Sequence, residues 1–398
     1  MADQTKKRGP KITVAGAAAQ RSGTTEAEQE ENNAKARKGA LFIGGVLVVY
    51  LAFLILTGEM ATFIDALKNV EAGWVLVACL SYVIYFAFGT LAFVVAVWLD
   101  HDSPVGIRDC AAVDASGIFF GNLTPMMAGA VPSQIFRLTR SGLDVGEAMA
   151  TQFTRFIMYQ VGLCVFGGLM LAARLEYFAA KFGNLVLINI VVFGMHVVEL
   201  TFLLVVSLCP NLVRRVGNWL IRLLAKRGWL KDFDHWNDLV NVQVQKFSDA
   251  FKRACSDLPS MGVTFVITMI ELLGLYMIPW FILKAFGISE NFITCLAIGS
   301  TIQLVGTAVP LPGGTGGVEA SFALFLGGVL GSKATAGYLV WRLVTFIGPT
   351  IFAAPLLGLR STSSVSIYHR WERLVSGGGI KALRGGVRAR LPKGGRRG

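Results

Sequence analysis

GNLTP at residues 121–125 and GTAVP at residues 306–310 lie in the middle of two hydrophobic stretches of this 398-residue chain. After each proline, a glycine follows at the fourth position and a polar residue at the ninth. These equivalent residues are Gly129 with Gln134 and Gly314 with Glu319. Because proline and glycine interrupt membrane helices, the two stretches predict broken segments at corresponding places in two halves of one membrane domain.

An arginine follows each proline about 30 residues later, Arg155 in the first half and Arg342 in the second, within an otherwise apolar helix. Two broken helices in corresponding halves are typical of a transporter's binding site. A coincidence between Gly/Pro-rich segments is the alternative, since membrane helices tolerate both residues. We favour a true repeat because glycine, proline and arginine all recur at near-constant offsets.

Composition places the chain among polytopic membrane proteins. Hydrophobic residues make up 54% of the sequence and charged residues 16%, and several apolar runs are long enough to cross about 30 Å of hydrocarbon. Residues 1–39 are expected to form a disordered cytoplasmic tail, and residues 359–398 a basic cytoplasmic tail. The six cysteines and four histidines show no ligand spacing, so we expect neither a metal nor a cofactor.

Hydropathy predicts an all-α fold with about six full spans and two re-entrant helical hairpins, or 8 to 10 membrane segments in total. The predicted spans are 40–58, 74–99, 147–173, 184–209, 260–285 and 334–358. The stretches 107–141 and 291–331 each carry a central break between limbs of about 12 to 18 residues. Such short limbs are more typical of hairpins than of full spans.

Basic residues concentrate in the two tails and between residues 211 and 257. The positive-inside rule therefore predicts a multi-pass protein of the cell membrane with both termini in the cytoplasm. Within the membrane domain, residues 40–358, the units 74–173 and 260–358 are then inverted repeats, joined by a cytoplasmic amphipathic linker at 210–258. If each hairpin is counted as two complete crossings, the chain crosses ten times and both termini again lie on the same side, so this alternative stays open.

A helix that begins inside the bilayer directs free N–H groups and partial positive charge at the cavity that it lines. Two such ends near the midplane would form an anion site, with the returning limbs beginning near Pro132 and Gly317. The expected substrate-binding residues are Pro125, Gly129, Gln134, Arg155, Pro310, Pro312, Gly313, Gly314, Gly316, Glu319 and Arg342.

A charged side chain near the bilayer centre costs at least about 2.5 kcal/mol on the lipid face, so both arginines need a polar partner. The candidates are Glu199, Glu271 and Glu319 on the protein, or a phosphate on the substrate. A structural ion pair, such as Arg342 with Glu319, is the alternative. Asp114, Glu199 and Glu271 lie in apolar stretches and are the candidates for proton or ion coupling.

The sequence resembles the flippase-type transmembrane domain of lysylphosphatidylglycerol synthase/flippase proteins and their stand-alone relatives. The resemblance covers residues 40–358, and its most specific part is PLPGGTGGVE at residues 310–319. It implies that a phospholipid or a lipid-linked head group, aminoacylated phosphatidylglycerol among them, is moved between leaflets. MMA at residues 126–128 departs from the family pattern, in which a basic residue is expected near the first proline. The identity of the head group is therefore open.

We expect a lipid flippase and not an enzyme, with membrane lipid as its partner. Nucleic acid is not expected, because orientation in the membrane explains the positive charge. A non-transporting scaffold, or an accessory subunit of a lipid-modifying enzyme, stays open. A transferase acting on lipid-linked sugar is less favoured, because only the isolated Asp100, Asp102 and Asp109 lie at a membrane face. A partner lipid-modifying enzyme and a homo-oligomer are open as well.

Overall fold

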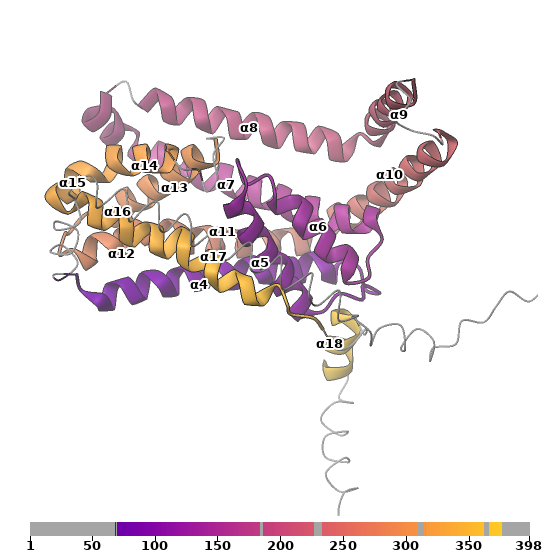
Figure 1. Cartoon of the computed structure of the whole chain (residues 1–398), viewed down its shortest axis with the longest axis horizontal. Helices are drawn as coiled ribbons and strands as arrows, with labels where there is room; N and C mark the ends of the chain where they lie inside the picture. Colours follow the sequence, from indigo (N-terminus) through magenta and orange to yellow (C-terminus); the bar gives the residue numbers. More distant parts are fainter. Residues whose placement is uncertain are drawn as a thin grey trace, which may run out of the picture. The chain divides into compact units, whose positions relative to one another are not determined.

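The structure is a computed structural model, and it describes residues 70–183, 186–226, 233–308, 316–361 and 366–375, together with Lys68 and Gly314. Contacts divide the chain into Met1–Ala61 and Thr62–Gly398, and every described residue belongs to the second unit. All regular elements in these ranges are helices (Figure 1), which confirms the all-α class. The predicted span 40–58 and the tail 1–39 lie outside the described residues.

Four helical runs are long and apolar enough to cross a membrane. They are α4 (Ala72–Trp98), α7 (Val145–Phe182), α11 with α12 (Leu258–Tyr276 and Ile278–Ala285), and the run Gly317–Leu356. A fifth is counted if α8 (Val186–Leu208) and α9 (Pro210–Lys226) form one broken span, since the chain bends by 89° between them. These runs overlap five of the predicted spans, although Gly317–Leu356 also includes residues predicted for the second hairpin, and the total of eight to ten segments stays a prediction.

The first break separates two helices that fold into an antiparallel hairpin, α5 (Ile107–Leu123) and α6 (Ala130–Arg140). Across the hairpin, Ser133 Oγ donates to the carbonyl oxygen of Ser116 at 3.1 Å. Helix α6 begins two residues before the predicted start at Pro132. A proline is tolerated there because the first four N–H groups of a helix have no partner within the helix.

The second break lies between α13 (Phe292–Ala308) and α14 (Gly317–Phe322), and α14 begins where the sequence predicts. Gly314 has φ +65°, and a Cβ placed on it would lie 2.5 Å from the carbonyl oxygen of Gly306. Only glycine fits this position, for both conformational and steric reasons. Most of this break, residues 309–313 and Thr315, lies outside the described residues.

The 40-residue run Gly317–Leu356 is itself folded back on its own length. After α14 come the π-helical η2 (Ala323–Gly327) and α15 (Gly328–Leu330), and the chain then reverses in η3 (Gly331–Lys333), where Gly331 has φ +57°. The returning limb consists of α16 (Ala334–Arg342), η4 (Leu343–Ile347) and α17 (Gly348–Leu356). The ring centroids of Phe322 and Trp341 lie 4.8 Å apart, so the two limbs pack as antiparallel neighbours.

Helices α4 and α11 cross at close range in the core. Ser81 Oγ donates to the carbonyl oxygen of Gly274 at 2.5 Å, and a Cβ on Gly274 would lie 3.0 Å from the backbone of Tyr85. Small residues let membrane helices approach in this way. Helix α7 packs against α4, α11 and α13, and Phe166 of α7 contacts Tyr276 of α11 with ring centroids 5.0 Å apart.

The openings of the two hairpins lie at opposite ends of α4. Where α4 begins, the N–H of its N-cap residue Glu71 donates to the carbonyl oxygen of Ala285 at 2.9 Å. At the same end, Lys333 Nζ donates to the carbonyl oxygen of Phe286 at 3.0 Å. Beyond the other end of α4, a Cβ on Gly142 would lie 3.0 Å from Pro104. The second hairpin therefore opens where α4 begins, and the first opens where α4 ends.

The remaining helices are amphipathic. Helices α9 and α10 (Phe233–Ser256) lie within residues 210–258, where the sequence predicts a linker. Helix α18 (Ile367–Val375) packs on the end of α4, where the rings of Tyr368 and Trp371 lie 5.4 and 6.2 Å from that of Trp98. On which side of a membrane these helices lie stays a prediction.

Candidate functional site

Arg155 of α7 and Glu271 of α11 form an ion pair in the core. Arg155 Nη2 donates to both carboxylate oxygens, at 2.6 and 2.7 Å, and the two side chains are only 6% and 3% exposed. The rings of Phe93 and Tyr159 lie 5.6 and 5.3 Å from the guanidinium carbon, close enough for cation–π attraction. Arg155 thus has the polar partner that its depth requires.

A second carboxylate lies beside this pair. Asp114 of α5 accepts a hydrogen bond from Thr90 Oγ1 at 3.1 Å. A Cβ placed on Gly89 would lie 2.9 Å from Asp114 Oδ2 and 3.1 Å from Glu271 Oε1. The missing side chain at Gly89 therefore makes room for two carboxylates: Glu271 bonds the guanidinium of Arg155, and Asp114 interacts with it electrostatically.

Glu199 of α8, the third candidate partner, does not pair with an arginine. Its Oε2 accepts a hydrogen bond from Gln160 Nε2 at 2.9 Å and lies 3.4 Å from Nδ1 of His196. Gln160 belongs to α7, so this polar cluster joins α7 to α8. On the other side of α7, Gln152 Nε2 donates to Gln134 Oε1 at 2.7 Å.

These groups line one cavity of about 420 Å³, which we call the inner cavity. Its polar lining residues are Tyr85, Asp114, Gln134, Gln152, Arg155, Tyr159, Gln160, His196, Glu199, Glu271 and Gln303. Cavities of this size commonly hold small ligands. The inner cavity therefore offers hydroxyl, amide and carboxylate groups to a polar ligand within an apolar helical domain.

Arg342 forms a second ion pair, with the half-buried Glu319. Arg342 Nη2 donates to Glu319 Oε1 at 2.7 Å, and Arg342 Nε donates to the hydroxyl of Tyr338 at 2.7 Å, while that hydroxyl donates to Glu319. The other carboxylate oxygen of Glu319 accepts the N–H of Gly316, ahead of the first turn of α14. Glu319 thus caps its own helix and ties it to α16, as the structural alternative predicts.

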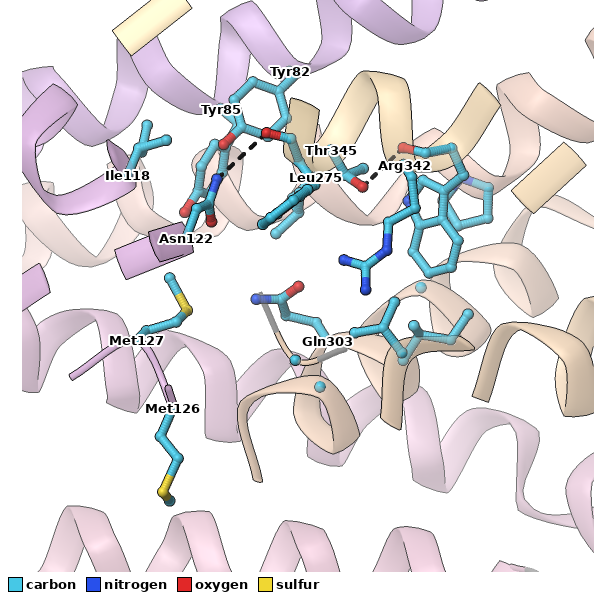
Figure 2. A pocket seen from close by; sticks show the side chains of 18 residues that line it. Tyr82, Tyr85, Ile118, Asn122, Met126, Met127, Leu275, Gln303, Arg342 and Thr345 are labelled. Atoms are coloured by element: carbon cyan, nitrogen blue, oxygen red, sulfur yellow. Dashed lines mark hydrogen bonds between the residues drawn. The ribbon is translucent and has the colours of Figure 1, made fainter. Parts of the chain in front are cut away.

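A smaller cavity of about 90 Å³, the break cavity, is lined by residues from both breaks. Met126 and Met127 come from the first break, and Gly314 comes from the second. Figure 2 shows the guanidinium of Arg342 and the amide of Gln303 directed into this cavity. The inner and break cavities share five lining residues, which places them side by side. The shared residues are Tyr85, Ile118, Met126, Met127 and Gln303.

Met126 and Met127 have the left-handed backbone angles φ +52° and +55°. Residues with a Cβ rarely adopt this conformation, and such strain clusters at ligand clamps and switch regions. Both methionines lie at the turn of the first hairpin and line both cavities. The segment without the expected basic residue is therefore one at which the two cavities meet.

The structure gathers only some of the predicted site residues. Gln134, Arg155, Asp114, Glu199 and Glu271 line the inner cavity, and Gly314 and Arg342 line the break cavity. Pro125, Gly129, Gly316 and Glu319 line neither cavity; Gly129 instead donates its N–H to Thr124 Oγ1 at 2.8 Å within the turn. Pro310, Pro312 and Gly313 lie outside the described residues.

Several lining residues escaped prediction. Gln152 and Gln160 of α7 lie three residues before and five after Arg155, so polar residues within an apolar helix were a usable signal. Gln303, within the apolar helix α13, carried the same signal, whereas Tyr85 and Tyr159 carried none, because tyrosine is an ordinary residue of membrane helices. Within the described ranges, no group of His, Cys, Asp and Glu side chains is arranged to hold a metal ion.

Sequence comparison places these features in a family. A relative from Methanothermobacter thermautotrophicus, named UPF0104 membrane protein, is 26% identical over 324 residues, 78% of this chain and 91% of the relative. A second UPF0104 membrane protein of that organism is 27% identical over 61% of this chain and 71% of its own length, and one from Archaeoglobus fulgidus is 23% identical over 61% and 73%. The family profile described as the lysylphosphatidylglycerol synthase TM region matches residues 40–353. The chain therefore belongs to the family of the lysylphosphatidylglycerol synthase transmembrane region.

Proposed function

We propose that this protein is a transporter that moves a phospholipid or a lipid-linked head group between the leaflets of the cell membrane. One observation carries the proposal: residues of two breaks about 185 residues apart in the sequence line the same cavity, together with Arg342. Paired helix breaks that meet at one polar site inside a membrane domain are the architecture of many transporters.

The two cavities suit different parts of a lipid head group. The break cavity has room for a group the size of a phosphate, and Arg342 and Gln303 face into it. The N-terminal end of α6 follows the first break and adds partial positive charge, whereas that of α14 is already capped by Glu319. The larger inner cavity would take the rest of the head group, aminoacylated phosphatidylglycerol being one candidate.

Alternating access would come from motion of one half against the other. The opposite openings of the two hairpins support an inverted arrangement of the units 74–173 and 260–358. Arg155 belongs to the first unit and Glu271 to the second, so this pair joins the halves and would have to rearrange. Asp114 and Glu271, which compete for one guanidinium, are the groups that we propose for proton or ion coupling, with Glu199 beside them.

The test is lipid movement in reconstituted vesicles. Fluorescent phosphatidylglycerol, its aminoacylated form and a neutral lipid would be supplied, and dithionite-accessible label would be followed for wild type, Arg342→Gln and Glu319→Gln. We expect one head-group class to move, and both substitutions to abolish its movement. Arg140→Gln is the matched control, because it removes an exposed arginine that lines neither cavity.

A scaffold without transport activity is the second candidate. It is favoured by one observation: Arg155 and Arg342 already have carboxylate partners, as purely structural ion pairs would. If wild-type protein moves no lipid of the panel while remaining folded and monodisperse, this result would favour the scaffold over the transporter. If Arg342→Gln moves lipid as fast as Arg140→Gln, the phosphate site is not at the break cavity.

A further inference from the structure

Glu199 is an unusual residue on the surface of α8. The side chain is 45% exposed, although α8 otherwise presents apolar residues outward. Met195, Val198 and Phe202 are 55%, 69% and 64% exposed, as expected of a helix that faces lipid. Glu199 lies near the middle of Val186–Leu208, where a carboxylate facing hydrocarbon alone would cost about 2.5–3.5 kcal/mol.

The inner cavity supplies the polar surroundings that Glu199 needs. Glu199, His196 and Gln160 all line it, and so do Arg155 and Glu271 in the core. The cavity therefore extends from the buried ion pair to the exposed edge of α8. At that edge the hydrogen bond from Gln160 to Glu199 joins the two helices.

Helices α7 and α8 pack closely about two turns from this point, through glycines. Gly167 and Gly168 of α7 face the ring of Phe193 of α8: a Cβ on Gly168 would lie 3.3 Å from the ring, and one on Gly167 3.9 Å. Because these two glycines have no side chains to interlock with α8, a change in the position of Phe193 would be enough to loosen the contact there. The polar contacts between α7 and α8 at the inner cavity are those of Gln160 with His196 and Glu199.

We propose that the seam between α7 and α8, at Gln160 and Glu199, is the lateral portal through which a lipid head group passes between the bilayer and the inner cavity. The acyl chains would stay outside, along the apolar face of α8. Glu199 and Gln160 would exchange their mutual hydrogen bond for bonds to a head group that carries hydroxyl or ammonium donors. The portal rests on the proposed transport function, because a scaffold has no need of it.

The chain carries a natural reporter at this seam. Cys164 is a free cysteine one helical turn beyond Gln160 on α7, and it interacts electrostatically with Glu199. In a background with the other five cysteines replaced by alanine, Cys164 would be exposed to vesicle lipid whose head group bears a maleimide. The control replaces Cys164 by alanine and carries Val198→Cys, a neighbour of Glu199 that is exposed on α8.

Each rate of lipid adduct formation is divided by the rate with N-ethylmaleimide, which corrects for thiol reactivity. If head groups enter at the seam, Cys164 is modified about tenfold faster than the cysteine at 198, because only the former lies beside a polar path through the bilayer. Equal ratios at the two positions, or no lipid adduct at Cys164, would overturn the portal. This readout does not depend on transport, so it fails separately from the proposed function.

A reversible cross-link tests the route itself. The contacts of Gln160 with His196 and of Gly168 with Phe193 place Met195 opposite Cys164, so Met195→Cys with Cys164 would be bridged by a reducible bis-maleimide. We expect bridging to slow lipid movement about tenfold or more and reduction to restore it, because the seam can no longer open. The same reagent on Met195→Cys with Cys164→Ala is the control. Unchanged movement in the bridged protein, or bridging between two copies instead of within one, would refute the portal.

Discussion

At the scale of single residues, the site is organised by an imbalance of charge. Asp114 and Glu271 converge on Gly89, and Arg155 is the guanidinium that they share. Removing one member of a buried charged group leaves its partners uncompensated, and this costs more than the intact pair contributes. The three residues should therefore differ in how much stability each substitution removes.

Arg155→Met should destabilise the protein more than Glu271→Gln. The first change leaves two buried carboxylates without a guanidinium and is expected to lower the free energy of unfolding by about 3–5 kcal/mol. The second leaves Arg155 with Asp114 nearby, so about 1–3 kcal/mol is expected for the lost hydrogen bonds. Equilibrium unfolding of both variants in one detergent measures the difference. An equal loss, or a larger loss for Glu271→Gln, would show that Asp114 does not compensate Arg155.

The need of Arg155 for a partner could be predicted from the sequence, but the partner could not. A charge in an apolar helix requires compensation wherever the helix lies, which is a local property. Glu199, Glu271 and Glu319 met the requirement equally, and only packing of α7 against α11 brings Glu271, 116 residues away, within 2.6 Å. The pairing of Arg342 with Glu319 was easier to predict, because the two residues lie on the two limbs of one reversal.

At the scale of elements, α18 is held to the end of α4 by aromatic and charged contacts. His369 Nε2 lies 3.3 Å from Asp102 Oδ1, and its Nδ1 lies 3.2 Å from Glu372 Oε2. These hydrogen bonds, first to Glu372 and then to Asp102, raise the pKa of His369 above its ordinary value of 6.5. Glu372 belongs to α18 itself, so protonated His369 favours the docked position of α18 through its bond to Asp102.

Docking of α18 should weaken as the pH rises. Because the folded-state pKa is raised, the contribution is fully present below pH 6.5 and is lost as the pH rises through the folded-state value. Hydrogen exchange of the α18 amides, corrected for intrinsic rates, should be slower at pH 6 than at pH 8. His369→Gln should remove this difference, and α9, which has no histidine, is the internal control. A pH difference that persists in His369→Gln would contradict the assignment.

Helix boundaries were predicted well where glycine marks them and less well where proline does. Gly316 and Gly317 mark the start of α14, and the reversal at Gly331 falls between the predicted stretches 291–331 and 334–358. The start of α6 was placed at Pro132, too late by two residues, because proline is equally acceptable anywhere in the first turn. Sequence alone cannot choose among those positions.

At the scale of the whole molecule, the cavities are what the sequence did not reveal. Breaks, arginines and carboxylates follow from local composition, whereas Tyr85 of α4 and Gln303 of α13 line both cavities only because the fold brings these two side chains to the same space. Contact between distant elements decides a cavity, and no periodic pattern encodes it. The two breaks were predicted to meet, and their shared lining of the break cavity supports that expectation.

The inverted arrangement makes a prediction about sidedness. Glu71 and Lys333 contact Ala285 and Phe286 at one end of α4, while Pro104 lies beyond the other end. If α4 crosses the membrane, positions 289 and 332 must therefore lie on one side and position 102 on the other. The positive-inside rule predicts that position 102 lies in the cytoplasm.

Single cysteines placed in a background without the six native ones would test this arrangement in oriented vesicles. Asp102→Cys should react with a membrane-impermeant maleimide only from the cytoplasmic side, and Ser289→Cys and Ser332→Cys only from the other. All three positions are exposed, so permeabilised vesicles should label them equally, which is the control.

Met126→Cys, at the tip of the first hairpin, should react slowly from either side if that hairpin is re-entrant, because its tip then lies at the depth of the cavities. Labelling of positions 102 and 289 from the same side would exclude the inverted arrangement. Rapid labelling of position 126 from the outer face alone would make the first hairpin two complete crossings, and the break cavity would then belong to the outer surface instead of the membrane interior.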